Sequence, residues 1–319
     1  MQAFRPARGL ASPHAQTIFA SYFRPRHTPP LVRQRLATPD GDFVDVDRLE
    51  ADPGAPHLLV LHGLEGSSRA GYVAAILRGA AERGWGAAAL NFRSCSGELN
   101  RAPRFYHSGE TSDALHVLAQ LRGQVRGPWG GVGFSLGGNV LLRLLAETGS
   151  AAPLAAAAAV SVPFDLQRCA RALDAPGFGW MAIYRGVFLR SLKRKAIAKA
   201  RCHPGVLDPA RVRAARGIEA YDDAVTAPLH GWESAAAYYA ACSSGPVLGD
   251  IRRPTLLVSA DDDPLAPAGA LPAGVEDNPA LTVLRTAHGG HVGFVEGSLA
   301  HPRYWAEERA LAFLDRHLA

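Results

Sequence analysis

The stretch GGVGFSLGGNVLLRLL, residues 130–145, combines three features that together indicate the fold of this chain. A short apolar run rich in glycine leads into Gly-x-Ser-x-Gly at residues 133–137, and an apolar pattern of helical period follows at once. A strand, a sharp turn and a helix in this order present the central serine, Ser135, on a turn too cramped for larger neighbours. The helix would direct its N-terminal dipole and free N–H groups at an oxygen reacting there. The stretch therefore predicts a serine nucleophile at the end of a buried strand.

A glycine-rich turn of a nucleotide-binding fold is the alternative interpretation of the same stretch. That fold requires Gly-x-Gly-x-x-Gly, but the third glycine position after Gly131 and Gly133 is occupied by Leu136. The motif therefore favours a nucleophile over a phosphate-binding loop.

Short apolar runs bounded by glycine or proline recur on both sides of this stretch. Several are apolar on both faces, as strands of a covered parallel sheet must be. Helix-period segments separate them, and two of these end at Gly84 and Gly123. The alternation predicts an α/β fold with a mostly parallel central sheet, right-handed crossovers and helices on both faces. The predicted strands lie at 57–63, 86–92, 130–135, 154–162, 254–260 and 281–286.

Two segments need separate interpretation. The alanine run at 155–159 favours a helix on propensity, but we predict a strand because the alternation requires one there. Residues 31–50 alternate in polarity around a Pro-Asp-Gly-Asp turn and predict a β-hairpin.

The alternation of predicted strands and helices is interrupted at about residues 165–245, which contain helical stretches and no convincing strand. This pattern is typical of a helical cap inserted into an α/β core. We expect one domain over 1–319, with a core at 31–164 and 246–319 and an N-terminal extension at 1–30.

A serine nucleophile needs a base, and the base needs an orienting acid. On this type of fold the acid follows the serine in the chain and the histidine comes last. Asp263 lies where the chain leaves a predicted strand, and His291 lies in a Gly-Gly loop after the next one. We therefore predict Asp263 as the acid and His291 as the base.

These two residues have neighbours that could compete with them. Asp261 and Asp262 could form a solvated turn or a metal ligand pair, and His288 is the rival base. A His-x-x-His zinc site would need a supporting glutamate and a third ligand, so we expect no metal.

An acyl-transfer site also needs two N–H donors for the tetrahedral oxyanion. The residue after the nucleophile, Leu136, supplies one, and the loop HGLEGSS after the first parallel strand predicts Leu64 as the other. His62 in this loop could be a second base, but its place at a strand end favours a structural role.

Composition limits the class of protein. Apolar residues make up 48% and charged residues 20%, as in globular chains. No apolar run is long enough to span a membrane, and Pro13, His14 and Gln16 interrupt any signal-peptide core. The four cysteines form no Cys-x-x-Cys pair and suggest reduced thiols, so we expect a cytoplasmic enzyme.

The net charge of +5 raises the question of nucleic-acid binding. The basic residues are scattered, apart from one cluster at 190–201, and no aromatic-basic recognition motif accompanies them. We therefore expect no nucleic-acid partner and interpret the cluster as a solvated helix face.

Several blocks of this sequence resemble the YheT-type esterases of the α/β-hydrolase superfamily, which are related to the eukaryotic abhydrolase-domain lipases. The resemblance extends from GLASPHAQT, near the N-terminus, almost to the C-terminus. The blocks are HGLEGSSRAGY, NFRSCSGELNR, YHSGETSD, GFSLGGNVLL, SVPFDL, YDDAVTAPLHG and GGHVGF.

The resemblance implies an α/β-hydrolase fold with Ser135 as nucleophile, Asp263 as acid and His291 as base. Ser94 stands where the family usually has glycine, and Leu265 stands where it usually has an aromatic residue. The eukaryotic relatives carry an N-terminal membrane segment that we do not expect here. The block YDDAVTAPLHG has no obvious chemistry, and we expect it to fix the cap to the core.

Together these observations predict a serine esterase or small lipase that cleaves carboxylic esters or acylglycerols without a cofactor. A hydrolase of another acyl or C–C bond is the alternative on the same fold, and a non-catalytic binding homologue is a further one. Peripheral lipid contact could arise through the cap. One apolar helical face there could either pack on the core or roof an acyl pocket; it comprises Trp180, Tyr184, Val187, Phe188 and Leu192.

Overall fold

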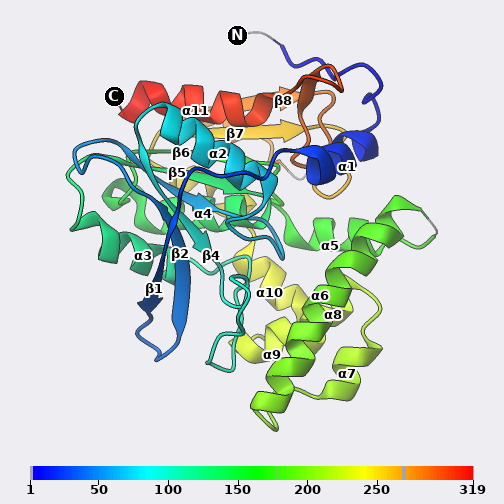
Figure 1. Cartoon of the computed structure of the whole chain (residues 1–319). Coiled ribbons are helices and arrows are strands. Elements are labelled where there is room, and N and C mark those ends of the chain that lie inside the picture. Colours follow the sequence, from blue (N-terminus) through cyan, green and yellow to red (C-terminus); the bar gives the residue numbers. More distant parts are fainter. Residues whose placement is uncertain (1–2, 178, 268–270, 319) are drawn as a thin grey trace.

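The computed structural model of the chain describes residues 3–177, 179–267 and 271–318. Within them, a central sheet has the strand order β1-β2-β4-β3-β5-β6-β7-β8 (Figure 1). Strand β2 is antiparallel to both β1 and β4, and the remaining neighbours are parallel. The strands are β1 (Val32–Ala37), β2 (Phe43–Leu49), β3 (His57–Leu61), β4 (Gly86–Asn91), β5 (Trp129–Phe134), β6 (Ala156–Val160), β7 (Thr255–Ala260), β8 (Leu281–Thr286), β9 (Val295–Gly297) and β10 (Pro302–Tyr304), the last two forming a separate ribbon.

Helices cover both faces of this sheet, as predicted. Helices α2 and α11 pack on one face, and α3 and α4 pack on the other (Figure 1). The α-helices are α1 (Pro13–Phe23), α2 (Gly71–Glu82), α3 (Ser112–Arg122), α4 (Leu136–Thr148), α5 (Leu166–Asp174), α6 (Trp180–Cys202), α7 (Pro209–Ala214), α8 (Ile218–Tyr221), α9 (Ala227–His230), α10 (Ala235–Cys242) and α11 (Trp305–Leu318). Short 3₁₀ turns lie at η1 (Gly149–Ala151), η3 (Gly245–Asp250) and η4 (Val275–Asp277), and a π-helical turn lies at η2 (Asp222–Thr226).

The alanine run is a strand, as predicted from the alternation rather than from propensity. All five residues of β6 are buried, and they alternate between the two core clusters on either side of the sheet. Helix propensity is a weak preference, and hydrogen bonding to β5 and β7 overrides it. Small side chains also allow helices to approach both faces of the sheet closely.

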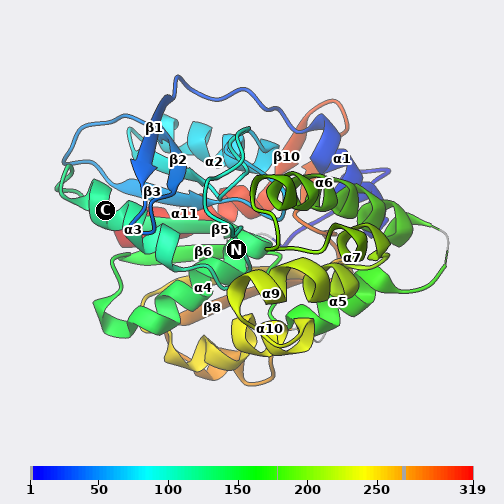
Figure 2. The same cartoon turned by 90° about the horizontal axis from the view of Figure 1, so that it is seen from below.

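Helices α5 to α10, which we call the inserted helices, lie between β6 and β7 in the chain. In the described part of residues 165–245 there is no strand, in agreement with the sequence. The inserted helices have an apolar core of their own, distinct from those on the two faces of the sheet. Figure 2 shows them gathered beside the sheet, with α6 next to α1.

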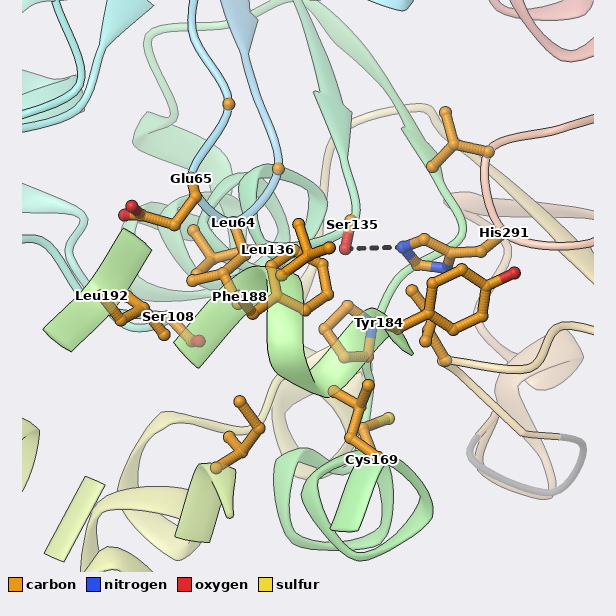
Figure 3. A pocket seen from close by; sticks show the side chains of 18 of the residues that line it. Leu64, Glu65, Ser108, Ser135, Leu136, Cys169, Tyr184, Phe188, Leu192 and His291 are labelled. Atoms are coloured by element: carbon orange, nitrogen blue, oxygen red, sulfur yellow. Dashed lines mark hydrogen bonds between the residues drawn. The ribbon is translucent and has the colours of Figure 1, made fainter. Parts of the chain in front are cut away.

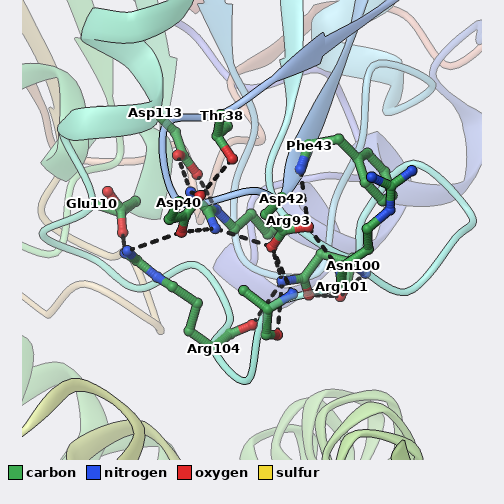
Figure 4. A network of polar contacts seen from close by, with 12 residues as sticks. Thr38, Asp40, Asp42, Phe43, Arg93, Asn100, Arg101, Arg104, Glu110 and Asp113 are labelled. Carbon is green, nitrogen blue, oxygen red and sulfur yellow. Dashed lines mark hydrogen bonds and ion pairs between the residues drawn. The ribbon is translucent and has the colours of Figure 1, made fainter.

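A buried ionic network fixes the loop that follows β4 (Figure 4). The Arg93 guanidinium donates to Asp113, Asp40 and Asp42 at 2.6–3.0 Å, and its side chain is 2% exposed. Burial disfavours the charge on Asp40, but hydrogen bonds from Arg93 and Thr38 outweigh this effect and lower its pKa to about 2. Asn100 extends the network by donating to Asp42.

The basic cluster at 190–201 is not a uniformly solvated face. Arg190 and Arg194 are exposed, as expected. The expectation is wrong for Lys199, which is fully buried and donates to Asn100 and to the Ala102 carbonyl oxygen. Burial lowers the pKa of Lys199 to about 8. Lys199 thereby connects α6 to the loop that Arg93 organises.

Ser94, in the same loop, has a φ of +65°, in the left-handed region that favours glycine. This explains why the resembling family usually has glycine there. In this chain the Ser94 hydroxyl bonds to Asn100 at 2.6 Å.

Candidate active site

Ser135 lies on the turn between β5 and the first residue of α4. Its backbone has φ 51° and ψ −122°, a conformation that costs energy for a residue with a side chain and persists only where surrounding contacts enforce it. The Ser135 N–H donates to the Val160 carbonyl oxygen at 2.9 Å. A Cβ at position 137 would lie 2.5 Å from the carbonyl oxygens of Leu61 and His62, so only glycine fits there. Packing therefore explains the Gly-x-Ser-x-Gly spacing.

The predicted serine, histidine and aspartate form one continuous hydrogen-bonded chain (Figure 3 shows its first link). The His291 Nε2 lies 2.9 Å from Ser135 Oγ, and its Nδ1 lies 2.9 and 3.0 Å from the two oxygens of Asp263. Because a carboxylate only accepts, Nδ1 carries the proton and Nε2 accepts from the serine hydroxyl. The Asp263 side chain is 2% exposed, and it also accepts from the N–H groups of Leu265 and Ala266.

The competing residues do not contact Ser135 or the His291 ring within the described part of the chain. Asp261 forms an exposed ion pair with Arg285. Asp262 accepts from the Gly290 N–H at 2.9 Å and pairs with His288 at 3.2 Å, but the His288 side chain is 55% exposed and does not line the cavity around Ser135. Of the three aspartates, Asp263 alone contacts His291 within the described residues.

The loop after β3 lies against Ser135, as predicted. A Cβ at Gly63 would be 3.2 Å from the Ser135 Cβ. The Tyr72 hydroxyl accepts from the Gly63 N–H at 3.0 Å, and the Tyr106 hydroxyl accepts from the Glu65 N–H at 2.8 Å. For the described part of the chain, no hydrogen bond engages the N–H of Leu64 or of Leu136, and both residues line the cavity beside Ser135.

His62 has a structural environment, in line with the favoured interpretation. Its Nε2 accepts from the Phe92 N–H at 3.1 Å, so its Nδ1 donates to the Gly63 carbonyl oxygen at 2.7 Å. Complete burial lowers the pKa of His62 to about 4. A neutral imidazole bonded at both nitrogens holds the loop and has no free position for proton transfer.

The N-terminal segment holds the His291 loop, a role that the sequence analysis missed. The His291 N–H donates to Thr17 Oγ1 at 2.9 Å, and the Gln16 side chain bonds to both the N–H and the carbonyl oxygen of Val295. Arg24 donates to the carbonyl oxygens of residues 292 and 293 and pairs with the buried Glu307. The block GLASPHAQT was the available signal, since it includes Gln16 and Thr17.

Close approach of α1 also accounts for the glycine before His291. A Cβ at Gly290 would lie 2.4 Å from the Pro13 carbonyl oxygen and 2.7 Å from Thr17 Oγ1. The residue has a φ of +60°, which glycine adopts without strain.

A cavity of about 660 Å³ opens beside Ser135 and His291. It is bounded by α1, α5, α6 and the loops after β3 and β5, and Figure 3 shows apolar side chains of α6 facing Ser135. All five residues of the predicted apolar face of α6 line it: Trp180, Tyr184, Val187, Phe188 and Leu192.

The block YDDAVTAPLHG contributes five of the residues that line this cavity, namely Tyr221, Asp222, Thr226, Leu229 and His230. Asp222 accepts from the Tyr239 hydroxyl at 2.6 Å and from the Thr226 hydroxyl at 2.5 Å, and Asp223 accepts from the Ala235 N–H at 2.6 Å. These bonds hold the inserted helices to one another, while the His230 ring contacts His107 of the core. The block thus serves mainly the inserted helices themselves.

No group of three or more His, Cys, Asp or Glu side chains in the described ranges could hold a metal ion. In these same ranges, no helix has both the length and the apolar character needed to cross a bilayer.

The sheet order, the strained serine turn and the hydrogen-bonded Ser-His-Asp chain together define the α/β-hydrolase class. The family profile for the alpha/beta hydrolase fold matches residues 56–298. The chain belongs to this family, and it is an enzyme of the esterase and lipase type.

Similar proteins include "Putative esterase YheT" of Escherichia coli K12, which is 40% identical over 99% of this chain and 94% of its own length. Monoacylglycerol lipase of Saccharomyces cerevisiae is 30% identical over 85% of this chain and 61% of its own, and mouse phospholipase ABHD3 is 29% identical over 88% and 71%. Among solved structures, the Pyrococcus furiosus esterase Pf2001 superposes with a TM-score of 0.59 at 16% identity, covering 92% of this chain and 99% of its own. That likeness supports the fold.

Proposed function

We propose that this enzyme is a serine carboxylesterase or small lipase that works through an acyl-enzyme intermediate. Ser135 attacks the ester carbonyl carbon while His291 Nε2 takes the hydroxyl proton and passes it to the leaving alcohol. His291 then activates a water that releases the acid and restores the serine. Asp263 fixes the tautomer of His291 and stabilises the imidazolium that forms in each step.

Two backbone N–H groups complete the proposed site. The tetrahedral intermediate places a negative charge on the former carbonyl oxygen, and preorganised donors stabilise it. Leu136 at the first turn of α4 and Leu64 in the loop after β3 are the proposed donors, because both N–H groups lack partners among the described residues. This mechanism requires no metal or organic cofactor.

The observation that carries the proposal is the Ser135–His291–Asp263 hydrogen-bond chain at the wall of a largely apolar cavity. A hydrolase of another acyl or C–C bond would use the same residues and remains the second candidate. The serine at position 135 disfavours the dehalogenase and epoxide hydrolase classes, whose members use an aspartate as the nucleophile at this turn. A non-catalytic binding protein would have no need of all three residues.

Labelling with a fluorophosphonate probe tests the proposal directly. The probe forms a covalent bond with an activated serine, and we expect peptide mapping to find it on Ser135. Absence of labelling in the folded protein would favour the non-catalytic alternative. Turnover of p-nitrophenyl butyrate then distinguishes an esterase from a hydrolase of other bonds.

We propose that the inserted helices act as a cap and that α6 roofs the acyl site. Each methylene buried under this roof contributes about 0.8 kcal/mol, so short-to-medium acyl esters should be preferred over acetate until the space is full. Phe188→Ala removes a cavity wall on α6 and should change the chain-length preference while acetate hydrolysis stays largely intact. The measurement is kcat/KM on p-nitrophenyl esters of increasing length.

Ile197→Ala is the matched control, because Ile197 packs among the inserted helices on the same helix without lining the cavity. An equal loss at every chain length in a stable Phe188→Ala protein would contradict the roof. An equal loss with a lower melting temperature would indicate plain packing.

The outer surface of α1 and α6 beside the cavity also supports a proposed contact with lipid surfaces. Large apolar side chains lie exposed on α1 and on the N-terminal half of α6, the two helices that flank the cavity. They are Tyr22 (69% exposed), Phe23 (67%), Trp180 (48%), Ile183 (53%) and Val187 (60%). Exposed arginines nearby, including Arg26 and Arg190, would favour anionic headgroups.

We expect Phe23→Ser to weaken binding to phosphatidylglycerol vesicles about tenfold, since one aromatic side chain then stays in water. Cosedimentation measures the partition, and hydrolysis of a monomeric ester should be unchanged. Val32→Ser, which removes a comparably exposed apolar side chain from the edge strand β1, is the control. Equal partition of the two variants would argue against this surface.

A further inference from the structure

The loop after β3 contains a tight turn that presents the Leu64 N–H. The Gly66 N–H donates to the Gly63 carbonyl oxygen at 3.0 Å, so Leu64 and Glu65 occupy the two central positions. Glu65 has a φ of +56°, a conformation that glycine or asparagine normally supplies at this point of a turn. A glutamate there needs surrounding contacts to hold it.

The side chain of Glu65 makes such contacts with two residues of α6. Lys195 Nζ donates to Glu65 Oε1 at 2.8 Å, and the Ser191 hydroxyl donates to Glu65 Oε2. The two α6 residues are one helical turn apart and face the same carboxylate. The Glu65 side chain is 7% exposed, so these charge-assisted bonds are shielded from water.

Glu65 is also held from the α/β core, by the hydroxyl of Tyr106. Tyr106 accepts from the Glu65 N–H at 2.8 Å and donates to Glu65 Oε1 at 3.0 Å. The backbone of Glu65 is thus fixed by the core, and its carboxylate is held jointly by Tyr106 and by the two residues of α6. Figure 3 shows Glu65 and Leu64 side by side, between Ser135 and the segment of α6 that carries Leu192.

We propose that Glu65 is a positioning residue through which α6 holds the Leu64 N–H in the oxyanion site. The proposal rests on the proposed role of Leu64. Its consequence is that the donor is aimed at the reacting oxygen only while α6 is seated on the loop. The helix that lines the acyl site then also completes the catalytic geometry.

This role differs measurably from that of a simple structural ion pair. A displaced donor weakens binding of the tetrahedral intermediate and leaves binding of the planar ester nearly unchanged, so kcat falls and KM does not. An ion pair that only shapes the cavity would change KM, and one that only stabilises the fold would change the melting temperature.

The experiment compares Lys195→Met, Ser191→Ala and Glu65→Gln with the wild type. Removing an oxyanion donor costs about 10²–10³ in kcat, so misplacing one should cost on the order of 10–100-fold, with KM within about threefold. The inhibition constant of an alkyl trifluoromethyl ketone, which forms a tetrahedral adduct with the serine, should rise in proportion to KM/kcat. The combined Glu65→Gln, Lys195→Met variant should lose little more than the single variants.

Lys193→Met is the matched control, because Lys193 lies on the same helix and donates to the Arg213 carbonyl oxygen, away from Glu65. Two of the test variants change α6 alone, so they remain informative if Glu65→Gln fails to fold.

The outcomes separate this proposal from the proposed function. If the wild type hydrolyses esters and is labelled at Ser135 while Lys195→Met and Ser191→Ala keep kcat within about twofold, the positioning role is wrong and the esterase assignment stands. A change in KM alone would also overturn the positioning role. A wild type that is neither active nor labelled would overturn both.

Discussion

Replacement of Ser135 by alanine should leave a folded protein that has lost ester hydrolysis by about 10⁴-fold or more in kcat. The hydroxyl is the atom that would bond to the acyl carbon, and in the present structure His291 is its hydrogen-bond partner. Alanine differs from serine only in that hydroxyl, so the turn with φ 51° should be retained. Turnover of p-nitrophenyl acetate and butyrate measures the effect, and circular dichroism checks the fold.

Ser150→Ala is a suitable control because Ser150 is exposed and does not line the cavity. It should keep full turnover and full fluorophosphonate labelling. Full turnover by the Ser135→Ala protein would end the serine-nucleophile proposal.

Asp263→Asn should lower kcat by roughly 10⁴-fold, the second large effect. An asparagine amide can donate to His291 Nδ1 and so favours the tautomer whose Nε2 carries a proton and cannot accept one from Ser135. The effect should appear in kcat. The free energy of unfolding should change little, and only because the carboxylate charge is lost. Steady-state kinetics at several pH values on one ester series measure it.

The neighbouring aspartates are the controls for that variant. Asp261→Asn should be nearly silent, since its ion pair with Arg285 lies at the surface. Asp262→Asn should be mildly impaired, because its oxygen accepts from the Gly290 N–H next to His291. An inactive Asp262→Asn protein beside an active Asp263→Asn protein would show that the acid has been misassigned by one residue.

Much of the fold could be predicted because its signals are local. The glycines around Ser135 are needed because the end of β3 lies close to the turn between β5 and α4. The positions of Asp263 and His291 follow from where the predicted strands end. The strand at 156–160 was predictable only from the spacing of its neighbours, since its own propensity indicates a helix.

The features that the sequence did not predict all depend on contacts between residues far apart in the chain. Nothing local to Lys199 indicates burial, because its partners Asn100 and Ala102 precede it by about a hundred residues. Likewise, no sequence motif marks the pairing of Tyr106 with Glu65. It is visible only in the structure, where the loop after β3 contacts α6. Periodicity cannot show such pairings.

The contact between α1 and the His291 loop has a consequence for how the protein is made. Thr17 and the His291 N–H that it accepts are separated by 274 residues, and Gln16 and Val295 by 279. At about 5–20 residues per second, a ribosome needs tens of seconds to synthesise the intervening chain. During that time α1, only 11 residues long, is too short to be a stable helix alone. The strand that leads to Ser135 can pair with β3 well before then, so Ser135 would be in place long before His291. Esterase activity should therefore emerge only after the His291 loop has been synthesised and has docked against α1.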